Sequence, residues 1–324
     1  MAEKDPKLRY IASPYNLKET LGWFKRNYLG VSKKNRNIVK SIPNHHILND
    51  KIAPKYSIAF IGDIMDMNKK NLVIGDKLKE FIKDCDYCVG NFEATITEEK
   101  GAFMAQHHIS QILDALSILF KPERTFLSLA NNHAGDFGRE IFTKSINEIK
   151  SHGFKIFGVK DNPFVDINNE IRIIGGTMWS NQKCNYIVKF EETSQYINPD
   201  FFNILYPHWS YELELFPRPK IVKIGNDLIN KFDAIIGHHS HCPQPLTSVR
   251  DNNYNINKLV GYGLGDFCIW EKLEHYFYGI VLKIEIGENE NGLRQIGEIN
   301  WEYTKCTPKS ENEWVTEIIE NFAL

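Results

Sequence analysis

The residues able to do chemistry gather at five points of the chain, and each point directly follows a short apolar segment. The five clusters are Gly62-Asp63, Gly90-Asn91-Phe92-Glu93, Asn131-Asn132-His133-Ala134-Gly135-Asp136, Pro207-His208-Trp209 and Gly237-His238-His239-Ser240-His241. They offer carboxylate, amide and imidazole groups without thiolates, which is the donor set of a hard-to-borderline divalent metal. Two such ions side by side would clamp the attacking and leaving oxygens of a phosphoryl transfer. The clusters therefore predict a metal site.

Each cluster has a simpler interpretation when taken alone. Gly62-Asp63 is typical of a turn, and Asn131-Asn132 could cap the helix that follows. His208 next to Trp209 is typical of a packed histidine. His239 and His241 are a stronger signal, because alternate residues of an extended segment share one face. The occurrence of all five clusters behind five apolar segments favours the metal site over these alternatives.

Alternating strands and helices must position these clusters. The apolar pattern predicts strands at 56–61, 87–90, 125–130, 155–158, 171–177, 202–206 and 234–237, and helices at 76–83, 110–120, 139–152 and 219–232. This alternation indicates an α/β fold. At the carboxyl edge of such a sheet the strand ends form the ligand crevice, so the clusters are expected to converge.

The flanking segments carry weaker predictions. A hairpin over 276–286 and 295–305 is expected at a sheet edge, and residues 178–200 are expected to form a loop. A closing helix is expected over 311–322. An amphipathic helix is expected over 17–29, where Trp23-Phe24 precedes Lys25-Arg26. That helix either docks on the body or contacts a membrane surface or partner.

The charge distribution divides the chain into a basic extension, residues 1–50, and a single domain, residues 51–324. Residues 1–51 carry a net charge of +7 and the remainder −9, within a total of −2. An acidic body excludes a general nucleic-acid partner, whereas the basic arm suggests peripheral contact with a membrane or an assembly complex. The absence of an apolar leader or spanning segment, and the six irregularly spaced cysteines, predict a cytoplasmic protein.

The motifs resemble those of the CapA family of poly-gamma-glutamate capsule biosynthesis proteins, which is related to the calcineurin-like metallophosphoesterases. The match covers Gly62-Asp63-Ile64-Met65, Gly90-Asn91-Phe92-Glu93, the block from Ala130 to Gly138, and Gly237 to His241. Gly261-Tyr262-Gly263-Leu264-Gly265-Asp266-Phe267 is similar to a late family motif. The resemblance implies a four-layer α-β-β-α sandwich and a centre of two divalent ions, with Mn, Fe or Zn favoured and Mg allowed.

The resemblance also implies roles for individual residues. The implied metal ligands are Asp63, Asn91, Glu93, Asn132, His208, His239 and His241. His133 resembles the catalytic histidine of the superfamily, and Asp136 either orients it or caps the next helix. His238, His107, His108 and Asp266 are expected to contact the ligands and support them. Each of these three histidines could instead be a packed or surface residue. The sequence departs from the related pattern at Met65, where the superfamily has a histidine ligand, and at Ser210, where the family has glycine.

These features predict a metal-dependent hydrolase, with a phosphoesterase of capsule or cell-surface polymer biosynthesis as the leading interpretation. Its substrate would be a small phosphorylated or anionic molecule related to such a polymer. His133 would protonate the leaving group. Two alternatives stay open: a non-catalytic subunit of a surface-polymer assembly system that retains a metal site, and a metal-dependent amide hydrolase.

Overall fold

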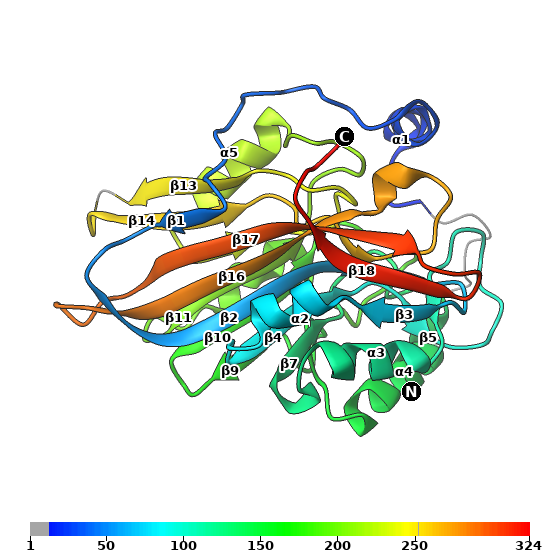
Figure 1. Ribbon diagram of the computed structural model, residues 1–324, viewed down its shortest axis with the longest axis horizontal. Coiled ribbons are helices and arrows are strands. Elements are labelled where there is room, and N and C mark those ends of the chain that lie inside the picture. Colours follow the sequence, from blue (N-terminus) through cyan, green and yellow to red (C-terminus); the bar gives the residue numbers. More distant parts are fainter. Residues whose placement is uncertain (1–12, 252) are drawn as a thin grey trace.

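The computed structural model describes residues 13–251 and 253–324, so the first 12 residues of the predicted basic extension lie outside it. Within these ranges, ten strands form a mixed sheet in the order β3-β18-β17-β16-β2-β4-β7-β8, with β1 beside β17 and β15 beside β2 (Figure 1). The bounds are β1 His45–Ile47, β2 Ile52–Ile64, β3 Asn71–Ile74, β4 Tyr87–Phe92, β7 Thr125–Ser128, β8 Lys155–Phe157, β15 Asp266–Cys268, β16 Tyr278–Asn289, β17 Arg294–Pro308 and β18 Glu313–Ile319.

A second sheet of six described strands has the order β13-β14-β12-β11-β10-β9. Its bounds are β9 Phe164–Ile167, β10 Ile171–Thr177, β11 Phe202–His208, β12 Ala234–Ile236, β13 Leu246–Asp251 and β14 Ile256–Gly261. The four inner strands are parallel and the two edge strands antiparallel. All seven residues of β11 are buried, as expected for a parallel strand covered on both faces. A short pair, β5 Thr95–Ile96 and β6 His107–His108, lies apart.

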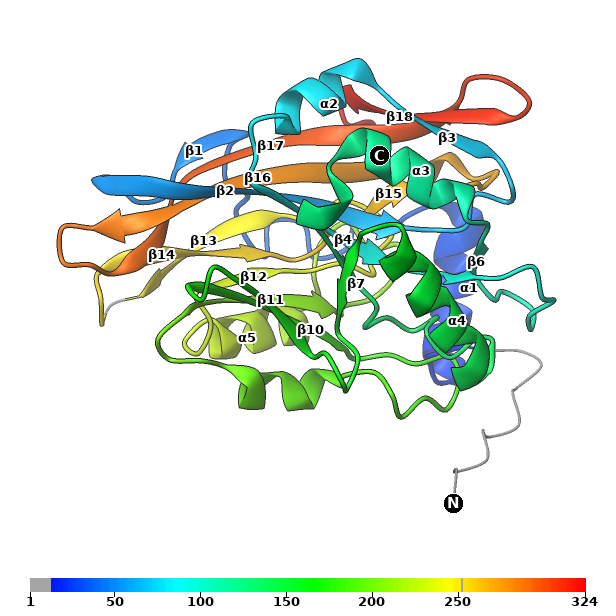
Figure 2. The same cartoon turned by 90° about the horizontal axis from the view of Figure 1, so that it is seen from below.

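Helices cover the outer face of each sheet, and Figure 2 shows the resulting four layers. The larger sheet carries α2 Asp76–Ile82, α3 Gln111–Leu119 and α4 Gly138–Ser151, and the smaller carries α5 Pro219–Leu228. Three short 3₁₀ segments, Pro122–Arg124, Phe190–Tyr196 and Glu274–Tyr276, complete the described elements. The four-layer α-β-β-α sandwich and the α/β class are therefore confirmed.

Apolar packing holds the layers together. The core between the two sheets includes Phe60, Val89, Ile204 and Ile284, and all four are fully buried. Two further cores fill the spaces under the outer helices. This packing fixes β2 and β4 of one sheet opposite β11 and β12 of the other, so the carboxyl ends of four strands that precede polar clusters meet at one edge.

Helix α1, Leu17–Leu29, has the bounds predicted from the sequence. Asn16 caps its first turn, with its Oδ1 accepting the Glu19 backbone N–H at 3.1 Å. Helix α1 lies on the body and also leaves a large part of its surface exposed. Docking on the body is therefore compatible with contact to a membrane surface or a partner.

Within the described ranges, no helix combines the length and the apolar character needed to cross a membrane. The cytoplasmic compartment stays a prediction.

Two sequence predictions are wrong. The segment predicted as a closing helix over 311–322 instead contains strand β18, Glu313–Ile319. Trp314 and Thr316 are buried in the core and alternate with half-buried neighbours, as in a strand with one covered face. The hairpin of β16 and β17 does not lie at a sheet edge. Strand β2 covers one side of it and β18 the other, so both strands are inside the sheet.

Candidate metal centre

The two glycine-containing motifs bring the chain into close contact at the strand ends. A Cβ on Gly62 would lie 1.9 Å from the Gly265 carbonyl oxygen, so only glycine lets β2 lie against the segment before β15. This contact places Asp63 directly opposite Asp266 in register. Gly237 is constrained in the same way, because a Cβ there would lie 2.1 Å from Nε1 of Trp209. The glycines of these motifs thus set the spacing of the site.

Three fully buried carboxylates form the centre of the site: Asp63, Glu93 and Asp266. Asn91 ties two of them together, since its Nδ2 donates to Asp63 Oδ1 at 2.7 Å and to Glu93 Oε2 at 3.0 Å. Within the described ranges, every ion-pair partner of the three carboxylates is a histidine, and none is a lysine or arginine. Three carboxyl groups buried together without a lysine or arginine partner fit a site that takes a cation.

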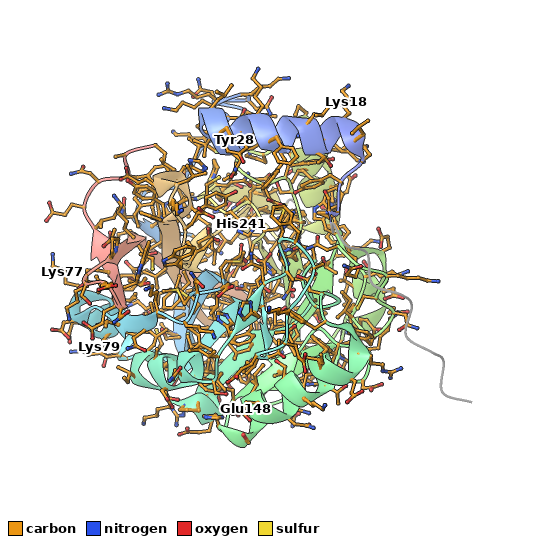
Figure 3. All side chains as sticks on the ribbon, turned by 90° about the vertical axis from the view of Figure 1, so that its right-hand side faces the viewer. Lys18, Tyr28, Lys77, Lys79, Glu148 and His241 are labelled. Atoms are coloured by element: carbon orange, nitrogen blue, oxygen red, sulfur yellow. The ribbon has the colours of Figure 1, made fainter. Side chains whose placement is uncertain are left out.

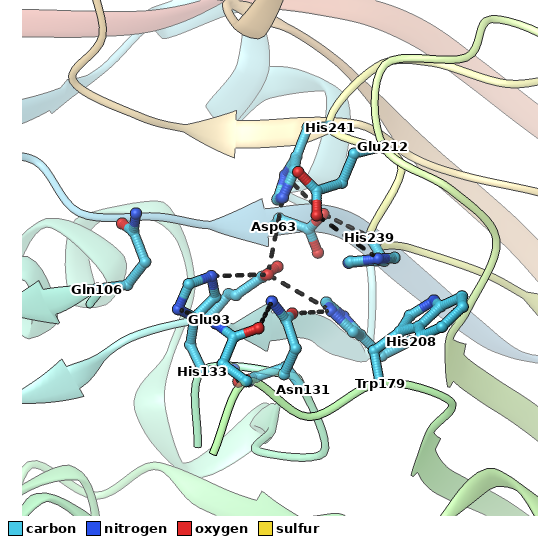
Figure 4. Close-up of polar contacts among 12 residues, drawn as sticks. Asp63, Glu93, Gln106, Asn131, His133, Trp179, His208, Glu212, His239 and His241 are labelled. Atoms are coloured by element: carbon cyan, nitrogen blue, oxygen red, sulfur yellow. Dashed lines mark hydrogen bonds and ion pairs between the residues drawn. The ribbon is translucent and has the colours of Figure 1, made fainter. Parts of the chain in front are cut away.

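Four histidines from two strand ends surround these carboxylates, as Figure 4 shows for three of them. His208 Nε2 lies 3.4 Å from Glu93 Oε1, and His241 Nε2 lies 3.8 Å from the same oxygen. His238 Nδ1 lies 3.4 Å from Asp63 Oδ1. The backbone N–H of His239 donates to Asp63 Oδ2 at 2.9 Å. All four imidazoles are buried.

Burial and mutual charge shape the protonation of these groups. Burial lowers the pKa of His208 and of His239 well below the ordinary value, and the neighbouring histidines lower both further. Burial raises the pKa of Asp266 to about 7 against the opposing effect of His241. Burial also opposes a low pKa at Asp63, but contact with His238 and the charge of His241 hold it at about 2. Asp63 thus keeps an anionic carboxylate, and His208 and His239 keep neutral imidazole nitrogens. Burial raises the pKa of Glu93, and the effect of burial on His241 is outweighed by the charges of Asp266 and Glu93, which raise its pKa. Binding of a metal ion by Glu93 or His241 would therefore release a proton.

Several buried side-chain oxygens and nitrogens that could bind a metal ion have no hydrogen-bond partner within the described residues. They include Glu93 Oε1, Asp266 Oδ2, His238 Nε2 and His239 Nδ1. Three overlapping groups could hold an ion, each with atoms within 4.8 Å of one another: Asp63, His208 and His238; Glu93, His239 and His241; Asp63, His241 and Asp266. Orphaned oxygens and nitrogens in this arrangement fit divalent metal. The sequence prediction of metal-holding residues at this edge is thus supported, and His238 and Asp266 enter the groups themselves.

Asn132 and His133 lie in the tight loop after β7. Asn132 Oδ1 lies 2.5 Å from His208 Nε2, so the predicted ligand asparagine faces a predicted ligand histidine. His133 Nδ1 lies 2.6 Å from Asp136 Oδ2, while its Nε2 faces Glu93 Oε1 at 4.0 Å. Helix α4 begins only at Gly138, with no side-chain cap. Asp136 therefore orients the imidazole and does not cap the helix.

His107 and His108 lie on β6 beside the cluster, outside the three groups. His108 is buried against Phe92 and its Nε2 lies 3.2 Å from the Ile64 carbonyl oxygen, which supports the strand after Asp63. His107 Nδ1 lies 3.3 Å from Asp66. Gln106, the residue before β6, contacts the site directly, because its backbone N–H donates to Asp136 Oδ2 at 3.1 Å.

Three residues of the site, Asn181, Tyr15 and Glu212, were not singled out from the sequence, and a fourth, Asn131, was considered only as a possible helix cap. Asn131 fixes the loop after β7, because its Nδ2 donates to the Phe92 carbonyl and its Oδ1 accepts the His133 N–H. Asn181 Oδ1 accepts a hydrogen bond from Asn132 at 3.0 Å. Tyr15 and Glu212 lie at His239, with Glu212 Oε1 3.9 Å from its Nε2. Asn181 could have been found, because it follows the strand at 171–177 as the other clusters follow theirs.

The loops that carry the histidines hold unusual backbone conformations. His239 has φ 88° and His241 φ 49°, both in the left-handed region that non-glycine residues rarely adopt. Ser210, after His208-Trp209, has φ 74°. A left-handed φ favours glycine, which is the residue that the resemblance predicts at this position. Strained backbone at convergent polar side chains is typical of a functional site.

Comparison with known proteins agrees with the motifs. A family model described as "Bacterial capsule synthesis protein PGA_cap" matches residues 48–176 and 186–270. The capsule biosynthesis protein CapA of Bacillus anthracis is 22% identical over 69% of this chain and 61% of its own length. The PGA biosynthesis protein CapA of Bacillus subtilis (strain 168) is 24% identical over 65% of this chain and 62% of its own. The chain thus spans less than two thirds of these relatives. The resemblance seen in the motifs is confirmed, and the chain belongs to the PGA_cap family of bacterial capsule synthesis proteins.

Proposed function

We propose that this chain is a metal-dependent hydrolase that cleaves a phosphoester in the synthesis of a capsule or another surface polymer. The substrate class is a small phosphorylated or anionic molecule related to that polymer. The two Bacillus relatives are named for capsule and PGA biosynthesis, which supports the setting. The cluster of buried carboxylates and histidines supports the chemistry.

The proposed site uses two divalent ions, with Mn, Fe or Zn favoured and Mg allowed. When bound, they would supply Lewis acidity and a water of lowered pKa. The residues that would hold them are Asp63, Glu93, Asn132, His208, His239 and His241, with His238 and Asp266 in reach. The predicted ligand Asn91 presents its Nδ2 to Asp63 and Glu93, and in this arrangement it ties the two carboxylates together. Asp136 accepts the Nδ1 proton of His133 and so fixes the ring. His133 Nε2, on the opposite side of the ring, then delivers a proton to the leaving oxygen.

One observation carries this proposal: the dyad of His133 and Asp136 faces the orphaned oxygen of Glu93. The 2.6 Å contact points Nε2 of His133 toward that oxygen, 4.0 Å away. His133 is in none of the three groups that could hold an ion, so its oriented imidazole has no assigned role as a ligand. An oriented imidazole next to the metal-binding groups favours an acid–base catalyst.

The first test is metal content and substrate class in the wild-type protein. We expect purified protein to retain close to two equivalents of divalent metal by elemental analysis. With added Mn²⁺ or Zn²⁺ it should release phosphate or alcohol from a panel of phosphomonoesters and phosphodiesters. Bound metal with release of an amine from gamma-glutamyl amides, and no phosphoester cleavage, would favour the amide hydrolase. Bound metal without turnover on either panel, or negligible metal, would favour the non-catalytic subunit.

A peripheral contact through the basic extension is a separate proposal, carried by the surface of α1. The helix docks through polar side chains: Arg26 lies 3.3 Å from Glu214, and Glu19 lies 2.7 Å from Arg218. Its outward face is apolar and exposed, with exposed fractions of 77% for Leu17, 62% for Leu21, 41% for Phe24, 73% for Tyr28 and 77% for Leu29. Figure 3 shows α1 across the top of the face that contains His241.

An anionic lipid surface fits this face better than a second copy of the chain. Exposed Lys18 and Lys25 flank the apolar stripe, and Lys33, Lys34 and Arg36 follow it. A second copy would place like charges opposite one another, whereas anionic headgroups complement them. We propose that α1 rests in the headgroup region of such a surface.

Vesicle co-sedimentation of the full chain tests the contact. We expect binding to vesicles containing anionic lipid that weakens with salt and is lost on neutral vesicles. Replacing Leu21 and Phe24 together by Gln should lower the partition coefficient roughly tenfold or more, because both side chains lose apolar burial. Ile118→Gln, equally exposed on α3, is the matched control. Equal sedimentation of the α1 variant and the control would remove the proposal.

A further inference from the structure

The segment before α1 reaches into the metal-binding cluster. Tyr15 Oη lies 2.8 Å from Nε2 of His239, and the same oxygen accepts the backbone N–H of Glu212 at 3.3 Å. Its ring lies edge-on to Trp179, with centroids 5.0 Å apart, and stacks on Tyr211 at 6.1 Å. Tyr15 is therefore held at the site by both its ring and its hydroxyl.

The two nitrogens of His239 have different surroundings. Nε2 faces Tyr15, whereas Nδ1 is buried without a hydrogen-bond partner in the described residues. A proton on Nδ1 would be a buried donor with nothing to accept it, which costs about 1–3 kcal/mol. The proton therefore belongs on Nε2, where it donates to the Tyr15 oxygen, and the Nδ1 lone pair stays free. His239 belongs to the group formed with Glu93 and His241, and Nδ1 is the His239 nitrogen that has no hydrogen-bond partner in the described residues.

We infer that Tyr15 is a positioning residue that completes the metal centre from outside the family-matched region, by holding His239 in the tautomer that leaves Nδ1 free to bind metal. The inference rests on the proposed metal-dependent function. Metal-binding histidines ordinarily donate their second ring N–H to a fixed acceptor, which sets the tautomer and the ring orientation. Here the acceptor lies at residue 15, whereas the family match begins at residue 48.

Several bonds to the body of the protein hold α1 and the residues before it in place, and so they stabilise the contact between Tyr15 and His239. Arg218 pairs with Glu19 at 2.7 Å and with Glu214 at 2.7 Å. Arg26 Nε donates to the Glu212 carbonyl at 2.7 Å, within the loop that also contacts Tyr15. Tyr276 donates to Asn27 at 2.7 Å. These bonds hold both ends of α1 on the body, through Glu19 in the first turn and Arg26 and Asn27 in the last.

The test compares Tyr15→Phe with Tyr211→Phe in the full chain. Tyr15→Phe removes the acceptor and keeps the ring that packs on Trp179, whereas Tyr211→Phe removes a hydroxyl of the same aromatic cluster that is not bonded to His239. We expect Mn²⁺ affinity, measured from the EPR signal of the free ion, to fall 10–100-fold in Tyr15→Phe and to stay near wild type in Tyr211→Phe.

A second readout separates positioning from packing. Long-range ¹H–¹⁵N correlation of metal-free protein should show His239 protonated on Nε2 in the wild type, and a mixture of tautomers in Tyr15→Phe. Equal affinity and equal tautomers in the two variants would overturn the inference. So would equal losses of affinity in both, because packing alone would then explain them. Failure of the wild type itself to bind Mn²⁺ or Zn²⁺ would instead refute the proposed function.

Discussion

Replacing His133 by Ala should leave the metals in place and remove most turnover on an alkyl phosphoester. His133 belongs to none of the three groups that could hold an ion, so metal content should stay at the wild-type level. Its loss as a general acid should lower the rate about 10²–10⁴-fold. With a nitrophenyl ester the loss should be much smaller, because nitrophenolate departs with little protonation. Steady-state kinetics on the two esters, with elemental analysis of each preparation, measure both effects.

Asp136→Asn is the matched variant, because it keeps the shape of the carboxylate that holds His133 Nδ1 at 2.6 Å. It should show the same dependence on the leaving group with a smaller overall loss. Loss of metal in His133→Ala would make His133 a ligand. Equal losses on both esters would show that the residue acts on something other than the leaving group.

Removing metal should destabilise the wild-type protein strongly, and should scarcely affect variants that lack a ligand. A ligand that binds only the folded state at about 100–1,000 times its dissociation constant raises the free energy of unfolding by about 3–4 kcal/mol. We expect a chelator to lower the midpoint of wild-type denaturation by the equivalent amount. His239→Ala and Asp63→Asn should contain less metal and respond little, and the asparagine retains an oxygen for the His239 N–H.

His45→Ala is the control, because it removes a histidine that lies outside the site. His45 lies on β1 and its ring is largely exposed. It should keep both its metal content and its response to chelator. Unchanged metal content in both His239→Ala and Asp63→Asn would contradict the assignment of the site. An unchanged denaturation midpoint of the wild type under chelation would show that metal does not contribute to its stability.

The fold and much of the site were predictable because the signals are local. Each polar cluster directly follows a buried strand, and parallel strands put their carboxyl ends at a common edge. His239 and His241, Asp63 and Glu93 come together for this reason. The closing segment was predicted wrongly because a short apolar pattern around Trp314 fits a helix and a strand almost equally well. Only its pairing with β17 and β3 decides the outcome.

The missed residues depend on long-range geometry. Tyr15 and Glu212 belong to irregular segments, where no periodicity indicates which way a side chain points. Tyr15 meets a histidine 224 positions later in the chain. The sequence also could not predict that α1 contacts the body through polar side chains and leaves its apolar side chains exposed. An amphipathic pattern indicates two faces but does not tell which one meets the protein.

The register between β2 and β15 sets a limit on when the site can exist during synthesis. Asp63 lies at the end of β2, and its partner Asp266 lies roughly 200 residues later in the chain. Ribosomes add about 5–20 residues per second, so Asp63 waits on the order of 10–40 s for Asp266. The two groups that could hold an ion without Asp266 are complete only once His238 and His241 have been made. Any ion that the full site takes up would therefore bind late in synthesis, after strands far apart in the sequence have come together.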